Sequence, residues 1–385
     1  MNVVAIACAR DEIDVIEPFV RHTVRTAARL IVLDNGSTDG TRDVLSSLQH
    51  EGLPLDVIDD PSPGKYLSRR LTRLMQEEAI GRWHADWIVP LDADEFLAVA
   101  PGHELVPSGL DAAVPLLLPW RSYVPRHGDR ADERNPLLRI RHRLAAEPHT
   151  LSKVIAPADL GRLPTAAIAQ GSHALTIDGQ PHPSRSHPHA YLAHYPIRSA
   201  AQFVVKTVLG HLQNEVMPYR DSFWGWHHRN HYELLKQDPA AFLARVPDLA
   251  SRYSRLVRED AGFETVDDPI EYLGGPLRYT PPASDMLAAW PPVLRYVQDL
   301  ARRCATLTAS LPEEGRGSVE SQTAARVFLI EQLAARDRLL ETLLTERATL
   351  ADDLSRLQSS WTWKAGRAVL WPGRVLKRMS QNLRS

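Results

Sequence analysis

The stretch of sequence that decides the fold is WIVPLDADEF, residues 87–96. Its apolar first half predicts a buried strand, and three carboxylates follow within four residues. Carboxylates at the end of a buried strand are costly unless a partner neutralises them, and a divalent cation shared with a substrate diphosphate is a common partner. Ligands of open α/β sheets also lie at strand ends. The alternative is a solvated acidic turn after a core strand.

Two more short apolar runs predict buried strands, at residues 3–9 and 30–33, and residues 55–58 predict a third strand. The helical patterns between the strands run through residues 13–24, 44–48 and 66–80. This alternation is typical of a parallel sheet wound with right-handed crossovers, so the first part of the chain predicts an α/β fold.

The composition excludes several classes of protein. With 44% apolar and 24% charged residues and a net charge of −2, the 385-residue chain is ordinary for a globular protein and has no general attraction to nucleic acid. The two cysteines, Cys8 and Cys304, suggest neither a disulfide framework nor a zinc site, which fits a cytoplasmic protein. We expect no signal peptide and no transmembrane helix, because neither pattern occurs.

Two phosphate-binding motifs are missing from the sequence. No Gly-x-Gly-x-x-Gly follows the first predicted strand, and no Gly-x-x-x-x-Gly-Lys-Ser/Thr occurs. The strand and helix pattern alone would admit a dinucleotide-binding enzyme. These absences argue against NAD-dependent enzymes and P-loop ATPases.

Two other motifs carry a resemblance to a known family. Residues 34–41, DNGSTDGT, and residues 92–94, DAD, resemble the nucleotide loop and the D-x-D metal motif of family-2-like glycosyltransferases with the GT-A fold. DADEF resembles the form in a bacterial branch whose first strand ends in Lys-Asn-Glu; here residues 10–12 read Arg-Asp-Glu. The resemblance is strong over residues 1–100, patchy to about 210 and absent beyond.

The resemblance implies a GT-A-type, Rossmann-like, mostly parallel sheet flanked by helices, and transfer of a sugar from a nucleotide diphosphate to an acceptor hydroxyl. It places Asp34 against the nucleobase, with a role in the turn as the alternative. Arg10 and Glu12 should line the same pocket, although Glu12 could instead cap the first helix.

The predicted helix before the acidic cluster carries two neighbouring arginines. The resemblance implies that one arginine there reaches the nucleotide, and Arg69 is the nearer match to the family than Arg70. The planar guanidinium suits a diphosphate because it pairs bidentately with phosphoryl oxygens. A solvated helix face is the alternative, and Lys65 is a weaker candidate for the same role.

Asp92 and Asp94 alternate, so in an extended segment they face the same side. One could contact the ribose or a metal-bound water while the other ligates the cation, and Mn²⁺ and Mg²⁺ both suit oxygen ligands. Glu95 could be a further ligand or a helix cap. The segment AHYPIRS, residues 193–199, followed by Phe203 and Lys206, resembles the family's H-Y-x-x-R/K-S segment, which implies that His194 is a late metal or diphosphate ligand.

The middle of the chain gives weaker signals. Residues 137–141 and 152–155 predict strand pieces on the acceptor side. The other histidines here have irregular spacing, which favours loop residues over a metal site; they are His173, His182, His187 and His189. Inverting chemistry needs an acid near the acceptor, and Glu215 and Asp221, next to the aromatic run 223–228, are the candidate bases.

The remaining chain reads as extensions. We divide the sequence into an enzyme domain 1–230, a helical extension 231–310 packed on it, a linker 311–318, a coiled-coil helix 319–360 and a basic, Trp-rich tail 361–385. Leu fills six of the eight a and d positions from 333 to 357, which favours a coiled coil. Arg336 and Arg347 fill the other two, so a helix folded back on the domain stays open as the alternative. Six basic residues, three tryptophans and no acid in the tail suggest a membrane surface.

The sequence thus predicts a metal-dependent, inverting hexosyltransferase that uses Mn²⁺ or Mg²⁺ and a nucleotide sugar, with a UDP-sugar as the first candidate. We expect a saccharide or lipid-linked acceptor in the synthesis of a cell-surface polysaccharide or glycolipid, and no nucleic acid partner. The enzyme would be cytoplasmic, peripheral on the inner face of the cell membrane, and able to form homo-oligomers through the coiled coil. The rival hypotheses are a nucleotidyltransferase and a non-catalytic assembly protein.

Overall fold

The computed structural model describes residues 1–62, 66–109, 114–130, 132–147, 151–215, 226–253, 264–282, 293 and 295–298. The chain divides into two units, Met1–Arg302 and Arg303–Ser385, and all of the described residues lie in the first. The predicted coiled coil and the basic tail lie outside the described residues.

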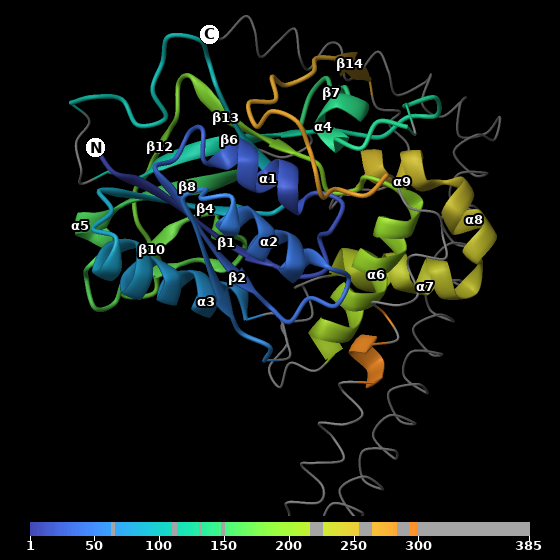
Figure 1. Ribbon diagram of the computed structural model, residues 1–385, viewed down its shortest axis with the longest axis horizontal. Helices are drawn as coiled ribbons and strands as arrows, with labels where there is room; N and C mark the ends of the chain where they lie inside the picture. The colour runs from blue at the N-terminus through green and yellow to red at the C-terminus, as the bar shows by residue number, and fades with distance from the viewer. Residues whose placement is uncertain are drawn as a thin grey trace, which may run out of the picture. The chain divides into compact units, whose positions relative to one another are not determined.

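The predicted parallel strands are present (Figure 1). They are β1 (Val3–Ala9), β2 (Arg29–Asp34), β3 (Leu55–Asp59) and β4 (Trp87–Asp92). They lie in the order β3-β2-β1-β4, and each neighbouring pair is parallel. Because the runs are apolar at nearly every position, both faces of this half of the sheet can be covered by helices.

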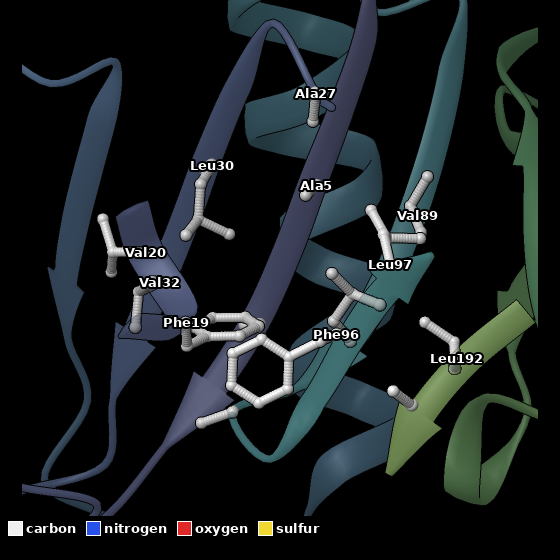
Figure 2. Close-up of a cluster of buried hydrophobic side chains, with 14 of the residues drawn as sticks. Ala5, Phe19, Val20, Ala27, Leu30, Val32, Val89, Phe96, Leu97 and Leu192 are labelled. Atoms are coloured by element: carbon white, nitrogen blue, oxygen red, sulfur yellow. The ribbon is translucent and has the colours of Figure 1, made fainter. Parts of the chain in front are cut away.

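Alternate residues of β1 point to opposite faces and define two cores. Ala5 belongs to a core with Phe19 of α1 (Ile16–Thr23) and Leu45 of α2 (Thr41–His50). Ile6 belongs to the second core, under α3 (Leu67–Arg73) and its π-helical continuation η1 (Leu74–Arg82). Figure 2 shows the first core, in which Phe19 lies beside Phe96 with their ring centroids 6.2 Å apart.

The sheet continues from β4 through β8 (Ser152–Pro157), β6 (Leu116–Ser122), β13 (Ala190–His194) and β5 (Glu95–Val99). β8 runs antiparallel to β4 and β6, and β5 antiparallel to β13, whereas β13 and β6 are parallel. β12 (Arg185–Ser186) pairs with β6.

The sheet must curl, because β4 and β5 are close in sequence but distant in strand order. Only Ala93 and Asp94 separate them, so the ends of the strands are within about 11 Å of each other. Four strand spacings in a flat sheet would separate them by about 19 Å. The curl therefore folds the sheet around the acidic cluster.

Smaller elements complete the described chain. Two minor sheets contain β9 (Ala167–Ile168), β10 (Leu175–Ile177) and β11 (Gln180–Pro181), and β7 (His142–Leu144) with β14 (Thr265–Asp267). The short helices are α4 (Pro136–Arg139), α5 (Ala158–Gly161) and η2 (Gln170–Ser172). The later helices are α6 (Ala200–Glu215), α7 (Trp226–Gln237), α8 (Pro239–Ala244) and α9 (Val246–Ser251).

One sequence expectation needs correction. Residues 137–141 do not form a strand: α4 begins there because Asn135 accepts a hydrogen bond from Leu137 N–H at 3.0 Å and Pro136 occupies its first turn. The segment predicted as a helical extension contains α7, α8 and α9, and also β14, which pairs with β7.

The segment 270–282 is fixed to α1 by one buried carboxylate. Glu17 accepts the backbone N–H groups of Arg278, Tyr279 and Thr280 at 2.7–2.8 Å. It also accepts Arg21 Nε at 2.9 Å. We call this arrangement the Glu17 clamp.

None of the helices in the described ranges has the length and apolar character needed to cross a bilayer.

Candidate active site

The carboxyl ends of three neighbouring parallel strands meet at one edge of the sheet. Ala9 of β1 lies opposite Asp34 of β2, and Cys8 of β1 lies opposite Asp92 of β4. Arg10 follows β1 directly. The fold therefore brings together Arg10, Asp34 and Asp92, three of the predicted nucleotide-binding residues.

The loop after β2 supports the loop after β1 through hydroxyl groups. Asp11 N–H donates to Ser37 Oγ at 3.0 Å, and Glu12 N–H donates to Thr41 Oγ1 at 2.8 Å. The Asp11 carboxylate accepts the Thr38 N–H at 2.7 Å. These bonds stabilise Asp11 at a φ of 53°, a left-handed conformation that non-glycine residues seldom adopt. The motif of residues 34–41 is therefore a frame for the residues after β1.

Asp34 has the turn role that the sequence left open, and the nucleobase role stays a prediction. One carboxylate oxygen, Oδ2, accepts the Ser37 N–H at 3.1 Å and so stabilises the turn. The other, Oδ1, is buried and has no hydrogen-bond partner within the described residues. A buried acceptor without a partner is costly, so Oδ1 is suited to a ligand donor group.

Arg10 closes the same edge. Its Nη1 donates to the carbonyl oxygen of Asn35 at 2.7 Å, and its guanidinium lies 4.3 Å from the centroid of the Tyr296 ring. Tyr296 is almost fully buried. It lies near the end of the described residues, whereas Arg10 lies near their start. No motif in the sequence had indicated it.

The helix before the acidic strand turns Arg70, and not Arg69, toward the strand ends. Arg70 is buried, and it donates to Asp60 Oδ2 at 3.0 Å and to the Ser62 carbonyl oxygen at 2.8 Å. Burial raises the pKa of Asp60, but hydrogen bonds from Ser62 and Arg70 outweigh it and lower that pKa to about 2. Arg69 is exposed. The alternative Lys65 lies outside the described residues.

A buried lysine pairs with the first and last carboxylates of the acidic cluster. Lys153 Nζ lies 2.8 Å from Asp92 Oδ2 and 3.3 Å from Glu95 Oε1. Glu95 also accepts the Asp92 N–H at 3.0 Å and begins β5, so the expectation of a helix cap is wrong. Burial lowers the pKa of Lys153, but Asp92 and Glu95 raise it more, so Lys153 stays charged.

The middle carboxylate, Asp94, pairs with a different lysine and also lies near an arginine and a histidine. Lys206 Nζ donates to Asp94 Oδ2 at 2.6 Å, Arg198 Nη1 lies 3.8 Å from the same oxygen, and His194 Nε2 lies 3.8 Å from Oδ1. Burial raises the pKa of Asp94, yet Lys206, His194 and Arg198 together lower it well below its usual range. Asp94 is therefore ionised although it is only 4% exposed.

His194 is positioned by its strand. In the register of β13 and β5 it lies opposite Glu95, and the Tyr195 N–H donates to the Asp94 carbonyl oxygen at 2.8 Å. Its ring stacks on Trp120 with centroids 4.4 Å apart. Burial lowers the pKa of His194 to about 4, so the ring is neutral near pH 7, the form that binds metals.

Arg198 ties the first loop to the start of α6. It donates to Asp14 Oδ2 at 2.8 Å and also to Glu12 Oε2. The helix α1 has Val15 at its N-cap and no side-chain cap. The carboxylate of Glu12 therefore pairs with Arg198 and does not cap α1.

The residues present fit a partial metal site. Asp94 Oδ1 and His194 Nε2 are 3.8 Å apart, near the spacing of about 3 Å expected for two ligands at right angles on a small divalent cation. His194 Nδ1 is buried with no hydrogen-bond partner in the described part of the chain. Across the described ranges, no group of three or more His, Cys, Asp or Glu side chains could hold a metal ion. The other ligands would be the diphosphate and water.

Of the two candidate bases, Glu215 is not part of this cluster. Glu215 is exposed at the last position of α6, nine residues after Lys206, and so about 13 Å along the helix axis from it. Asp221 lies outside the described residues. Three of the other histidines contact backbone carbonyls: His173 that of Ser152 and His187 that of Leu105, each at 2.8 Å, and His182 that of Pro183 at 3.0 Å.

The structure adds site residues that the sequence did not assign. Lys153 is a single charged residue in an apolar strand, and this gives no recognisable sequence motif. Asp14 lies between the first strand and α1. For Arg70 a signal existed: with Leu67, Leu71 and Leu74 it completes the i, i+3, i+4, i+7 spacing of one helix face.

Comparisons with known proteins agree with the motifs. Residues 4–100 match the model of glycosyl transferase family 2. A search of curated proteins gave no match.

Two solved structures show weak likeness. A mannosyltransferase from Pyrobaculum calidifontis, in complex with GDP-Man and Mn²⁺, is 15% identical, with 66% of this chain and 76% of that chain covered and a TM-score of 0.30. A Bacillus anthracis protein described as a putative glucose-1-phosphate thymidylyltransferase, in complex with sucrose, is 12% identical. The match covers 68% of this chain and 98% of that chain, with a TM-score of 0.24. These TM-scores are too low to support an argument.

The family match and the fold together confirm the resemblance that the two motifs predicted. Residues 4–100 are thus similar to family-2 glycosyltransferases, and the mixed sheet flanked by helices is consistent with the GT-A type.

Proposed function

We propose that the protein transfers a sugar from a nucleotide-sugar donor to an acceptor hydroxyl. The observation that carries the proposal is the meeting of Arg10, Asp34 and Asp92 at the carboxyl edge of β1, β2 and β4, inside the segment that matches the family. Ligands of open α/β sheets bind at this edge.

Each part of the donor has a matching group in the chain. Asp34 Oδ1, buried and without a partner, accepts a hydrogen bond from the nucleobase. Arg10 lines the nucleotide pocket, and Asp92, whose side chain is 36% exposed, reaches the ribose or a metal-bound water. Arg70, fixed by Asp60 and Ser62, contributes positive charge at the same edge.

Asp94 and His194 hold a Mn²⁺ or Mg²⁺ ion in this proposal. The ion would neutralise charge on the leaving diphosphate. His194 binds through a neutral ring, and Asp94 stays ionised throughout the physiological range because its pKa is lowered. For an inverting reaction a carboxylate must receive the acceptor proton, and Glu215 and Asp221 stay as proposals for that base.

The wider role rests on the extensions. We propose a hexosyl donor, with a UDP-sugar first, and an acceptor that is a saccharide or lipid-linked saccharide of a cell-surface polysaccharide or glycolipid.

Homo-oligomers would form through residues 319–360. Residues 361–385 would hold a cytoplasmic enzyme on an anionic membrane, where each basic residue contributes about 1 kcal/mol of binding free energy. A variant ending at Ser360 should keep transfer and lose binding to anionic vesicles at low salt. If the full-length chain ignores such vesicles, the membrane proposal fails.

A thermal-shift panel of nucleotide sugars, each with and without Mn²⁺, tests the proposed function, since a ligand specific for the folded state raises the melting temperature. We expect one nucleotide sugar to stabilise the protein most, and product analysis with that donor to give a glycoside and a nucleoside diphosphate. Release of pyrophosphate from a nucleoside triphosphate would instead indicate a nucleotidyltransferase. No metal-dependent stabilisation by any nucleotide sugar would favour a non-catalytic assembly protein.

A further inference from the structure

Two lysines neutralise the acidic cluster, but they differ in how firmly they are placed. Lys153 is fully buried and its ammonium contacts two carboxylates, Asp92 and Glu95. Lys206 contacts one carboxylate, Asp94, and its side chain keeps 20% of its surface exposed. Lys153 is therefore fixed on all sides, whereas Lys206 can leave its partner without being moved through the core.

The surroundings of Lys206 give its ammonium a second position. Besides Asp94, Nζ donates to the Pro196 carbonyl oxygen at 3.0 Å and lies 5.2 Å from the centroid of the Tyr253 ring. The long, flexible side chain of lysine allows the charge to shift while its carbon stem stays packed. Asp94 would keep Arg198 and His194 beside it if the ammonium moved.

Lys206 occupies the carboxylate that a metal ion would have to share. It takes Asp94 Oδ2 at 2.6 Å, while the second donor, His194 Nε2, lies 3.8 Å from the other oxygen of the same carboxylate. An ammonium and a divalent cation on one carboxylate repel each other strongly at such distances. A diphosphate arriving with the metal supplies new negative charge, with which the displaced ammonium can pair.

We propose that Lys206 is a built-in counter-ion of Asp94, which a divalent cation displaces only together with the donor diphosphate. This inference rests on the proposed function, because it assigns the diphosphate to the site of Asp94. It implies that metal binds weakly to the protein alone, and that Lys206 moves from Asp94 to the diphosphate when the donor binds.

Two variants of the full chain test the proposal. Lys206→Met removes the ammonium and keeps an apolar stem, and Lys206→Gln keeps a donor for the Pro196 carbonyl in case the Met variant does not fold. Lys236→Met is the matched control, since Lys236 is an exposed lysine on α7 whose ion pair is with Glu233, so the change in net charge is the same. Melting curves establish that each protein is folded.

The first measurement is the affinity for Mn²⁺ without nucleotide, followed by electron paramagnetic resonance of the free ion. We expect Lys206→Met or Lys206→Gln to bind Mn²⁺ about tenfold more tightly than the wild type, because a charged hydrogen bond no longer competes for Asp94. The control should match the wild type. The second measurement is the affinity for UDP or GDP with saturating Mn²⁺, which should fall about tenfold in the Lys206 variants and not in the control.

Unchanged or weaker Mn²⁺ binding in a folded Lys206 variant would overturn the inference. Equal tightening in Lys236→Met would also overturn it, because the effect would then be one of net charge. Failure of the proposed function is distinct: the wild type would then bind neither UDP nor GDP when Mn²⁺ is present.

Discussion

Two buried carboxylates of the same domain, Glu17 and Asp94, are held in opposite ways. Glu17 accepts three backbone N–H groups and the Arg21 side chain, all from groups with fixed positions. Asp94 is neutralised by side-chain cations, the nearest of which is the partly exposed Lys206.

The difference shows how a buried charge can serve structure or binding. Backbone amides cannot leave Glu17 unless the chain unfolds locally, so its charge fixes the fold. Around Asp94, long side chains can rearrange, and His194 Nδ1 has no partner among the described residues. A carboxylate with exchangeable partners is able to accept a ligand, and one with fixed partners is not.

The largest expected effect is on stability at the clamp. Glu17→Ala leaves the Arg278, Tyr279 and Thr280 amides without their acceptor, and it should lower the free energy of unfolding by about 3–5 kcal/mol. Chemical denaturation measures it. Glu51→Ala is the matched control: Glu51 also pairs with Arg21 but is more exposed, so about 1 kcal/mol or less is expected. Equal losses would show that burial of Glu17 is unimportant.

The second effect is on activity at the acidic cluster. Asp94→Asn removes the charge that holds Lys206 and the proposed metal, and transfer should fall about 100- to 1000-fold, as when a main electrostatic group of an active site is removed. Its melting temperature should fall less than that of Glu17→Ala. Unchanged turnover would remove Asp94 from the site, and a collapse in stability would erase the contrast with Glu17.

A third change sharpens the comparison at the nucleotide end. Asp34→Ala should weaken UDP binding by about 1–3 kcal/mol, since a buried hydrogen-bond donor of the nucleobase would lose its acceptor. Isothermal titration measures the loss. Asp59→Ala is the control, because Asp59 lies opposite Asp34 at the end of β3 but is exposed and paired with Arg42. Wild-type affinity in Asp34→Ala would leave Asp34 with its turn role alone.

The smallest effect is a pH dependence of the clamp. Burial raises the pKa of Glu17, but hydrogen bonds from Arg278 and Tyr279 outweigh it and bring it below the ordinary value of 4.5. Because the folded pKa is the lower one, the stabilisation is present above about pH 4.5 and is lost as the pH falls through the folded value. The stability difference between the wild type and Glu17→Gln should shrink as the pH falls below about 4.5. A constant difference would contradict this assignment.

The sequence predicts the parallel half of the fold well, because β1, β2 and β4 are continuous apolar runs with polar loops at their ends. It could not predict the partners of the acidic cluster. Arg198 meets Asp14 across 184 residues, and Lys153 meets Asp92 across 61, and no local pattern records such contacts.

Other differences had local causes. The prediction of a strand at 137–141 followed its apolar residues and overlooked the Asn-Pro pair before them, which begins a helix. Arg69 was preferred to Arg70 by likeness to the family, although the phase of the apolar residues places Arg70 on the buried face. The roles assigned to Asp34, Asp92, Asp94 and His194 stay predictions, and the variants above test those of Asp34 and Asp94.

The Glu17 clamp has a consequence for the making of the protein. Glu17 can accept the hydrogen bond of Arg278 only after Arg278 has been synthesised, 261 residues further along the chain. At about 5–20 residues per second, a ribosome needs roughly 13–50 s to cover that distance. During that time the nascent chain exposes the surface of α1 that segment 270–282 later covers. We expect chaperones to bind there during synthesis, and release of the native protein to depend on residues far beyond the family match.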